Sequence, residues 1–166
     1  MATQVPIADG VFTWPPPAAG PQLIGSRCRH CGTVTFPRQH GCPNCTAEEM
    51  DDTLLARRGT LWTWTTQGFL PKEPYRGPGS PPQAPAPAGA VGEAAAPAGE
   101  ENEDDYEPYT LGYVELPGEV KVETRLTERD PARLRIGMEM ELVLFPFRHE
   151  ADGTEVMGYA FQPVES

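Results

Sequence analysis

The sequence predicts a mainly β protein in which a small ribbon held by four cysteines precedes a five-stranded barrel. All four cysteines of the 166-residue chain fall into two Cys-x-x-Cys pairs within the segment CRHCGTVTFPRQHGCPNC. Five short segments with strand character follow, and no long stretch shows the periodicity of an amphipathic helix. A segment rich in proline, alanine and glycine separates the first of these strands from the second.

Residues 1–22 are expected to form a Pro-rich N-terminal arm. The prolines at positions 15–17 and Pro21 prevent a regular helix there. Phe12 and Trp14 are the only aromatic residues before the cysteines. We therefore expect these two rings to fix an extended arm to another part of the molecule. The alternative is a frayed terminus.

Residues 23–50 contain the candidate metal ligands, which are Cys28, Cys31, Cys42 and Cys45. Two Cys-x-x-Cys turns let four thiolates surround one tetrahedral ion. Gly32 follows the first pair, where a left-handed residue helps the turn to close. The spacing predicts a structural metal ribbon made of two turns and a small hairpin. The intervening TVTFPRQHG contains one apolar strand, in which Phe36 is the expected hydrophobic anchor.

The spacing leaves the metal open between zinc and iron, because four thiolates bind either ion in the same geometry. An iron site would make the protein an electron carrier. Disulfides are disfavoured by the reducing compartment that we expect for this chain. Disulfide exchange is disfavoured because no α/β domain surrounds the pairs. His30 and His40 lie near the cysteines and are expected to be exposed turn residues.

The barrel is expected to comprise residues 51–70 and 109–166. Its first strand covers residues 58–69, RGTLWTWTTQGF, which are rich in Thr, Trp and Leu and contain no proline. Strict alternation places Trp62 and Trp64 on one face of this strand and Leu61 on the other.

Residues 71–108 differ in composition from the rest of the chain. Nine of these 38 residues are proline, and eight are acidic against two basic, so the segment carries −6 of the net charge of −11. Few of its side chains can join a core, and we expect it to be disordered. It is either an insertion tolerated at a loop tip or an acidic tether that shields or competes for a basic partner surface.

Four further strands are expected at residues 109–116, 119–127, 138–147 and 155–162. The segment EVKVETRLT shows clean alternation, with Val122 and Leu126 on one face and charged residues on the other. Before the fourth strand, DPARLRIG predicts a turn or short helical bridge anchored by Leu134 and Ile136. Five short strands with a connector between the third and the fourth fit an OB-fold, and an SH3-like barrel is the competing interpretation.

The net charge and the apolar pattern argue against several classes of protein. A phosphate-backbone binder normally presents a basic surface, so a nucleic-acid-binding protein is the disfavoured alternative for a chain of charge −11. The sequence contains no run of about 18 apolar residues, so no membrane span is expected. The N-terminus lacks the basic and apolar regions of a secretory signal, and a cytoplasmic location is therefore expected.

Several segments resemble those of one known family, in the same serial order. They are LIGSRCRHCGTVTFPRQHGCPNC, RGTLWTWTT, YTLGYVEL, ARLRIGMEMELVLF and YAFQPV. The chain resembles the proteins classed as domain of unknown function 35 (DUF35), in which a rubredoxin-like zinc ribbon precedes an OB-fold. The resemblance covers most of residues 23–70 and 109–164, and it favours Zn2+ as one structural ion per chain.

The resemblance implies that the chain works as a subunit of another enzyme. Members of the family bind a thiolase-like enzyme and support its work on acyl-CoA substrates. Such enzymes include thiolases and retro-aldolases that shorten sterol side chains, so a role in lipid or steroid degradation is implied. The family's partners are commonly dimers, so the resemblance also implies a two-plus-two heterotetramer. Two features depart from the family pattern. PPPAAGP replaces the usual N-terminal helices, and the loop after the first strand carries roughly thirty extra residues.

No sequence pattern marks a catalytic site. A phosphate-cradling G-x-x-x-x-G-K-S/T loop is absent, and every cysteine is assigned to the metal, which leaves none as a nucleophile. A weaker prediction is a contact with CoA at the shared interface. Arg27, Arg29 and Arg38 surround the ribbon and would meet its phosphates, while Trp62 or Trp64 would stack on adenine. The alternative is solvated arginines and one core tryptophan.

Overall fold

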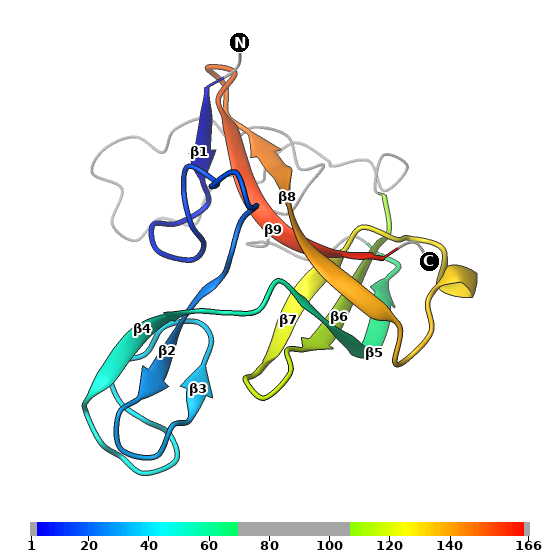
Figure 1. Ribbon diagram of the computed structural model, residues 1–166. Helices are drawn as coiled ribbons and strands as arrows, with labels where there is room; N and C mark the ends of the chain where they lie inside the picture. The colour runs from blue at the N-terminus through cyan, green and yellow to red at the C-terminus, as the bar shows by residue number, and fades with distance from the viewer. Residues whose placement is uncertain (1–2, 70–106, 165–166) are drawn as a thin grey trace, which may run out of the picture.

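Two β-sheets make up the computed structural model, which describes residues 3–69 and 107–164 (Figure 1). A six-stranded sheet carries the barrel, and a three-stranded sheet forms the ribbon at the lower left of the view. Within the described residues, no helix is long and apolar enough to cross a membrane. The expected disorder of residues 71–108 falls almost wholly outside the described residues.

The barrel closes through five strands. They are β5 (Arg58–Gln67), β6 (Tyr109–Glu115), β7 (Lys121–Leu126), β8 (Glu139–His149) and β9 (Glu155–Pro163). Neighbouring strands follow the order β9-β7-β6-β5-β8, and β8 pairs with β9 to close the ring. All of these pairs are antiparallel except β7 with β9. The closed five-stranded barrel confirms the mainly β prediction.

Alternation along the strands fills the barrel with apolar side chains. Val122, Thr124 and Leu126 of β7 point inward and are buried, whereas the charged residues between them face outward. All five strands contribute large, fully buried side chains to the barrel, among them Leu61, Val114, Val122, Met140, Leu142 and Phe161. The period-two pattern of the sequence therefore predicted the core of the barrel.

A β-bulge in β5 overturns one prediction about the two tryptophans. The register against β6 shifts between Leu61 and Thr63, so Trp62 is an extra residue without a direct partner. As a result Trp62 is half-exposed on the outer face, while Trp64 packs against the hydrophobic core. The expectation that both rings share one face was wrong.

The ribbon is a three-stranded antiparallel sheet. Its central strand β2 (Ile24–Cys28) pairs with β3 (Val34–Thr35) on one side and with β4 (Met50–Leu54) on the other. The short β2–β3 hairpin matches the sequence prediction, whereas β4 was not predicted. A glycine is required at position 25 of β2, because a Cβ on Gly25 would lie 2.5 Å from the carbonyl oxygen of Thr35 in β3.

The N-terminal arm is fixed at two points. Strand β1 (Gln4–Pro6) extends the barrel sheet by pairing in parallel with β9. Phe12 is buried, with 2% of its surface exposed, and forms a bridge with Leu23 immediately before β2. Trp14 packs edge-on against Phe12 with a centroid distance of 6.2 Å. Both rings thus anchor the arm as expected, while the β1 pairing was not predicted.

Ribbon and barrel share one hydrophobic cluster. Leu23 lies where the chain enters the ribbon, and Leu55 lies where the chain leaves it for the barrel. Both side chains join the same buried cluster as Leu61 of the barrel. Phe36 of the ribbon packs edge-on against Tyr159 of β9, with a centroid distance of 5.7 Å. The ribbon is therefore held against the outer wall of the barrel.

The connector before β8 matches the sequence prediction only in part. Residues Pro131–Arg133 form a short 3-10 helix, and Asp130 caps it by accepting a hydrogen bond from the backbone of Ala132. Leu134 is buried as expected, but Ile136 is 72% exposed and anchors nothing in the described part of the chain. The prediction for Ile136 was wrong because Gly137 turns the chain with φ +86° directly after it.

We predict that Phe12→Ala lowers the free energy of unfolding by about 3–4 kcal/mol, since it removes a fully buried ring from the cluster joining arm and ribbon. Chemical denaturation followed by tryptophan fluorescence measures this change. Ile136→Ala is the matched control, and its exposed side chain should change the free energy of unfolding by less than about 0.5 kcal/mol. Equal effects of the two substitutions would show that the arm does not stabilise the fold.

Candidate metal centre and adjoining groove

The four predicted cysteine ligands converge on one point. Their sulfur atoms all lie within 4.8 Å of one another. Cys28 Sγ is 3.6 Å from Cys45 Sγ, and Cys31 Sγ is 3.5 Å from Cys42 Sγ. Disulfides are excluded at such separations, because an S–S bond measures about 2.05 Å. Four sulfurs at about 2.3 Å from one zinc ion would be roughly 3.8 Å apart, so the cluster fits a tetrahedral thiolate site.

The two metal-binding turns repeat one backbone pattern. In the first turn the carbonyl of Cys28 accepts from the N–H of Gly32, and in the second the carbonyl of Cys42 accepts from the N–H of Thr46, both at 3.0 Å. Gly32 has φ +75° and Thr46 has φ +61°. The sequence therefore places a glycine at one left-handed position and a β-branched residue, which adopts that conformation at a cost, at the other.

Hydrogen bonds and burial push the cysteine pKa values in opposite directions. The hydroxyl and backbone of Thr33 lower the pKa of Cys31 to about 5. The backbone N–H of Ala47 lowers the pKa of Cys45, but burial and the three neighbouring sulfurs outweigh it and raise that pKa to about 12. Without a cation the thiols cannot all ionise together, so a divalent ion that compensates four thiolates suits the cluster.

The structure does not bring the predicted CoA contacts together. Arg29 forms a bidentate ion pair with Asp51, which raises the pKa of the guanidinium and lowers that of the carboxyl. Arg38 is 2.8 Å from Asp52, and Arg27 donates a long hydrogen bond of 3.4 Å to a ribbon carbonyl. These residues lie on the ribbon, whereas Trp62 and Trp64 belong to β5 of the barrel.

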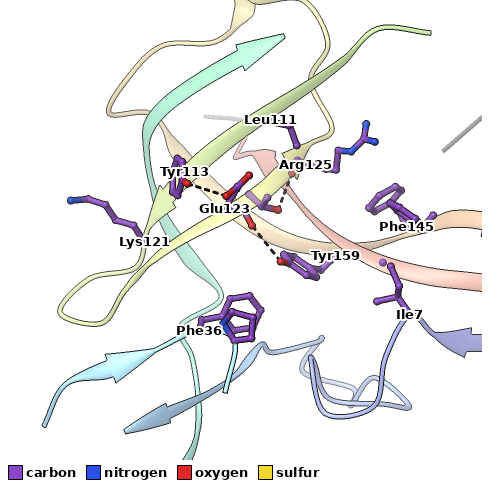
Figure 2. Close-up of a pocket in the computed structure, with 13 residues that line it drawn as sticks. Ile7, Phe36, Leu111, Tyr113, Lys121, Glu123, Arg125, Phe145 and Tyr159 are labelled. Carbon is purple, nitrogen blue, oxygen red and sulfur yellow. Dashed lines mark hydrogen bonds between the residues drawn. The ribbon is translucent and has the colours of Figure 1, made fainter. Parts of the chain in front are cut away.

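A groove of about 600 Å³ lies where the ribbon meets the barrel (Figure 2). Its barrel side comes from β6, β7, β8 and β9, and Phe36 of the ribbon and Ile7 of the arm complete the lining. The lining residues are Ile7, Phe36, Pro37, Leu111, Tyr113, Lys121, Glu123, Thr124, Arg125, Phe145, Phe147, Gly158 and Tyr159. Side chains of the barrel thus form one wall of a groove whose 13 lining residues include five aromatic rings.

Glu123 organises the polar part of the groove. Its carboxylate accepts a 2.9 Å hydrogen bond from the hydroxyl of Tyr113, and its backbone carbonyl accepts one of 3.3 Å from Tyr159 (Figure 2). The bond to Glu123 raises the pKa of Tyr113, and burial raises the pKa of Tyr159 to about 12. Both phenols are therefore neutral donors at physiological pH and hold the groove in a fixed shape.

Two family models match the parts of the chain that build these features. A model described as the rubredoxin-like zinc ribbon domain of ChsH2 matches residues 17–51, and one described as the C-terminal OB-fold domain of ChsH2 matches residues 94–145. Together they span more than half of the chain. The chain belongs to the DUF35 family. The ribbon is a zinc ribbon and the barrel an OB-fold, so the four cysteines form a structural zinc site.

Curated relatives align over most of this DUF35 chain. A protein of Thauera aromatica named benzoylsuccinyl-CoA thiolase subunit BbsA is 28% identical over 89% of this chain and 82% of its own length. A DUF35 domain-containing scaffold protein of Methanocaldococcus jannaschii is 26% identical, over 87% and 83% respectively. A solved structure titled Ltp2-ChsH2(DUF35) aldolase matches the fold with a TM-score of 0.52 and 24% identity, over 86% of this chain and 84% of that one.

Sequence reasoning found the metal ligands of this DUF35 protein but missed the groove. The alternation of residues 119–127 already placed Lys121, Glu123 and Arg125 on the outer face of the barrel. The opposite wall comes from Ile7 and Phe36, which are far away in the chain, and no local pattern indicates that they face β7.

We predict that Cys31→Ser abolishes stoichiometric zinc binding and unfolds the ribbon, because the free energy of zinc binding is also the folding free energy of such a module. Cys31 suits the test since its side chain is exposed and packs against no core. Zinc content per chain by plasma mass spectrometry measures the loss. His30→Ala is the control and should keep its zinc. A zinc-replete Cys31→Ser protein would contradict the four-thiolate assignment.

The two left-handed positions should respond to substitution with opposite signs. Thr46→Gly should raise the free energy of unfolding by about 1 kcal/mol, because glycine adopts positive φ without the cost that a β-branched residue incurs. Gly32→Ala should lower it by about the same amount, and only through the backbone, since no atom lies within 4 Å of the added Cβ. Thermal unfolding of the zinc-loaded proteins measures both. Changes of the same sign would contradict the common geometry of the two turns.

Proposed function

We propose that this chain is a non-catalytic accessory subunit that binds and supports a thiolase-superfamily enzyme acting on acyl-CoA substrates. The observation that carries the proposal is the alignment with a protein named as a thiolase subunit, which covers 89% of this chain and includes both ribbon and barrel. The cluster chemistry is consistent with it. All four cysteines of the chain bind the metal, and four thiolates saturate a zinc ion and leave no open position for catalysis.

We extend the proposal to the setting of this complex. The partner is a thiolase or a retro-aldolase in a sterol- or lipid-degrading pathway of the cytoplasm, and the two proteins assemble as a two-plus-two heterotetramer. The names of the Thauera protein and of the Ltp2-ChsH2 aldolase support both kinds of partner reaction. Acyl-CoA at the shared interface belongs to the same proposal.

A direct CoA contact on this chain involves fewer residues than the sequence suggested. Arg29 and Arg38 are engaged by ribbon aspartates, and Trp64 packs against the core. Arg27 makes only a long hydrogen bond to a carbonyl, and Trp62 is half-exposed. We propose Arg27 as the phosphate contact if CoA reaches the ribbon.

We predict that the tagged full-length protein, purified from its native cells, recovers a thiolase-superfamily protein. Mass spectrometry identifies the recovered protein, and size-exclusion chromatography with light scattering gives the mass of the complex. Adding the chain to the isolated partner should raise its turnover of an acyl-CoA. Recovery of no thiolase-superfamily protein from cells that express one would refute the proposed function.

A further inference from the structure

The β-bulge in β5 turns a large aromatic side chain toward solvent. Because Trp62 is inserted between two paired residues, the following Trp64 reaches the core while Trp62 stays outside. Trp62 remains 50% exposed, although a tryptophan gains much of its stabilising effect from burial. Bulges commonly re-aim a side chain at functional surfaces. The bulge therefore indicates that Trp62 is a contact residue.

Trp62 is held in place before any partner arrives. The ring of Tyr113 packs edge-on against it at a centroid distance of 6.2 Å, and Lys121 Nζ lies 4.4 Å from the centre of the Trp62 ring. Tyr113 is in turn fixed by its hydrogen bond to Glu123. We call Trp62, Tyr113 and Lys121 the aromatic platform. A rigid aromatic side chain loses little conformational entropy on binding, which is why such residues dominate protein interfaces.

The aromatic platform is continuous with the groove. Tyr113 and Lys121 belong to both, so the surface around Trp62 continues into the groove. Figure 2 shows Tyr113 and Lys121 on the barrel side of the groove and Phe36 on the ribbon. An exposed aromatic side chain beside a partly enclosed apolar groove is the usual anatomy of an interface centre.

Positive and negative side chains are equal in number on this surface. This balance distinguishes between a phosphate-rich ligand and a protein ligand. Lys121 Nζ lies 3.4 Å from Glu115, and Arg125 stacks on Tyr109 in the neighbourhood of Glu123. The face therefore carries two cations and two carboxylates within a chain of net charge −11. A phosphate-rich ligand requires an excess of cations, whereas the centre of a protein interface is depleted of net charge. An apolar protein surface complements this face better than a nucleic acid.

We propose that the aromatic platform and the adjoining groove dock the thiolase-superfamily enzyme, which seats an apolar or aromatic side chain of its own in the groove against Tyr113 and Phe36. The proposal rests on the proposed function and assigns its contact surface. The ribbon supplies one wall of the groove, so the docking surface is complete only when the metal-bound ribbon is folded.

The test measures the affinity of full-length variants for the thiolase-superfamily enzyme that the wild-type chain recovers from cells. Biolayer interferometry should give a Kd at least about 10-fold weaker for Trp62→Ala, as expected for a central interface tryptophan. Trp62→Gln should weaken binding similarly while keeping a longer side chain on β5. Ile136→Ala removes an even more exposed apolar side chain elsewhere and should leave the Kd within about 2-fold. Unchanged zinc content and melting temperature show that each variant is folded.

Several results would overturn the assignment. If folded Trp62→Ala and Trp62→Gln bind the enzyme like wild type, the docking surface lies elsewhere, while the proposed function stands. Equal weakening by Ile136→Ala would have the same meaning. If the Trp62 variants lose self-association of this chain but keep the wild-type Kd for the enzyme, this face is a self-association surface. Trp62-dependent binding of a thymidine oligonucleotide at low salt would make it a nucleic-acid surface. If the wild-type chain recovers no such enzyme, the proposed function and this inference both fail.

Discussion

Four sulfur atoms within 4.8 Å of one another impose the constraint on which the rest of the molecule depends. The ribbon strands have five, two and five residues, so the ribbon cannot bury enough apolar surface to fold by itself. Cross-linking through a compensated thiolate cluster replaces that missing core. The fixed ribbon can then present Phe36 to Tyr159 of the barrel, and with that contact one wall of the groove comes into place.

A few contacts fix the orientation of the ribbon relative to the barrel. Leu23 and Leu55 enter the common hydrophobic cluster at the two chain crossings. Arg57, at the start of the barrel, donates a hydrogen bond to the carbonyl of Ala19 in the arm and lies 3.5 Å from Glu141 of β8. Arm and barrel therefore meet at Arg57, and the shared hydrophobic cluster joins the ribbon to both.

Local patterns predicted the elements of this chain far better than their non-local contacts. The ligand cysteines were predictable because each metal-binding turn is formed by four consecutive residues, Cys-x-x-Cys, and the residue that follows them. Val122 and Leu126 were predictable because strand alternation is a local pattern. Strand β1 was missed since three residues carry no period and its pairing with β9 spans nearly the whole chain. The Trp62 bulge was missed because β5 combines threonine and tryptophan, whose mixed polarity does not mark an inner face.

The barrel face formed by β6 and β7 shows how one fold can change its class of ligand. These are the second and third strands of the OB-fold, whose outer face binds oligonucleotides in other OB-folds through stacking aromatic rings and cations. This chain keeps the aromatic rings in Tyr113 and Trp62 but pairs the cation of Lys121 with Glu115. Because the stacking surface is retained without an excess of positive charge, its attraction for phosphates is weakened while its attraction for apolar surface remains. The balance of two cations and two carboxylates on these neighbouring strands therefore favours a protein ligand on this face.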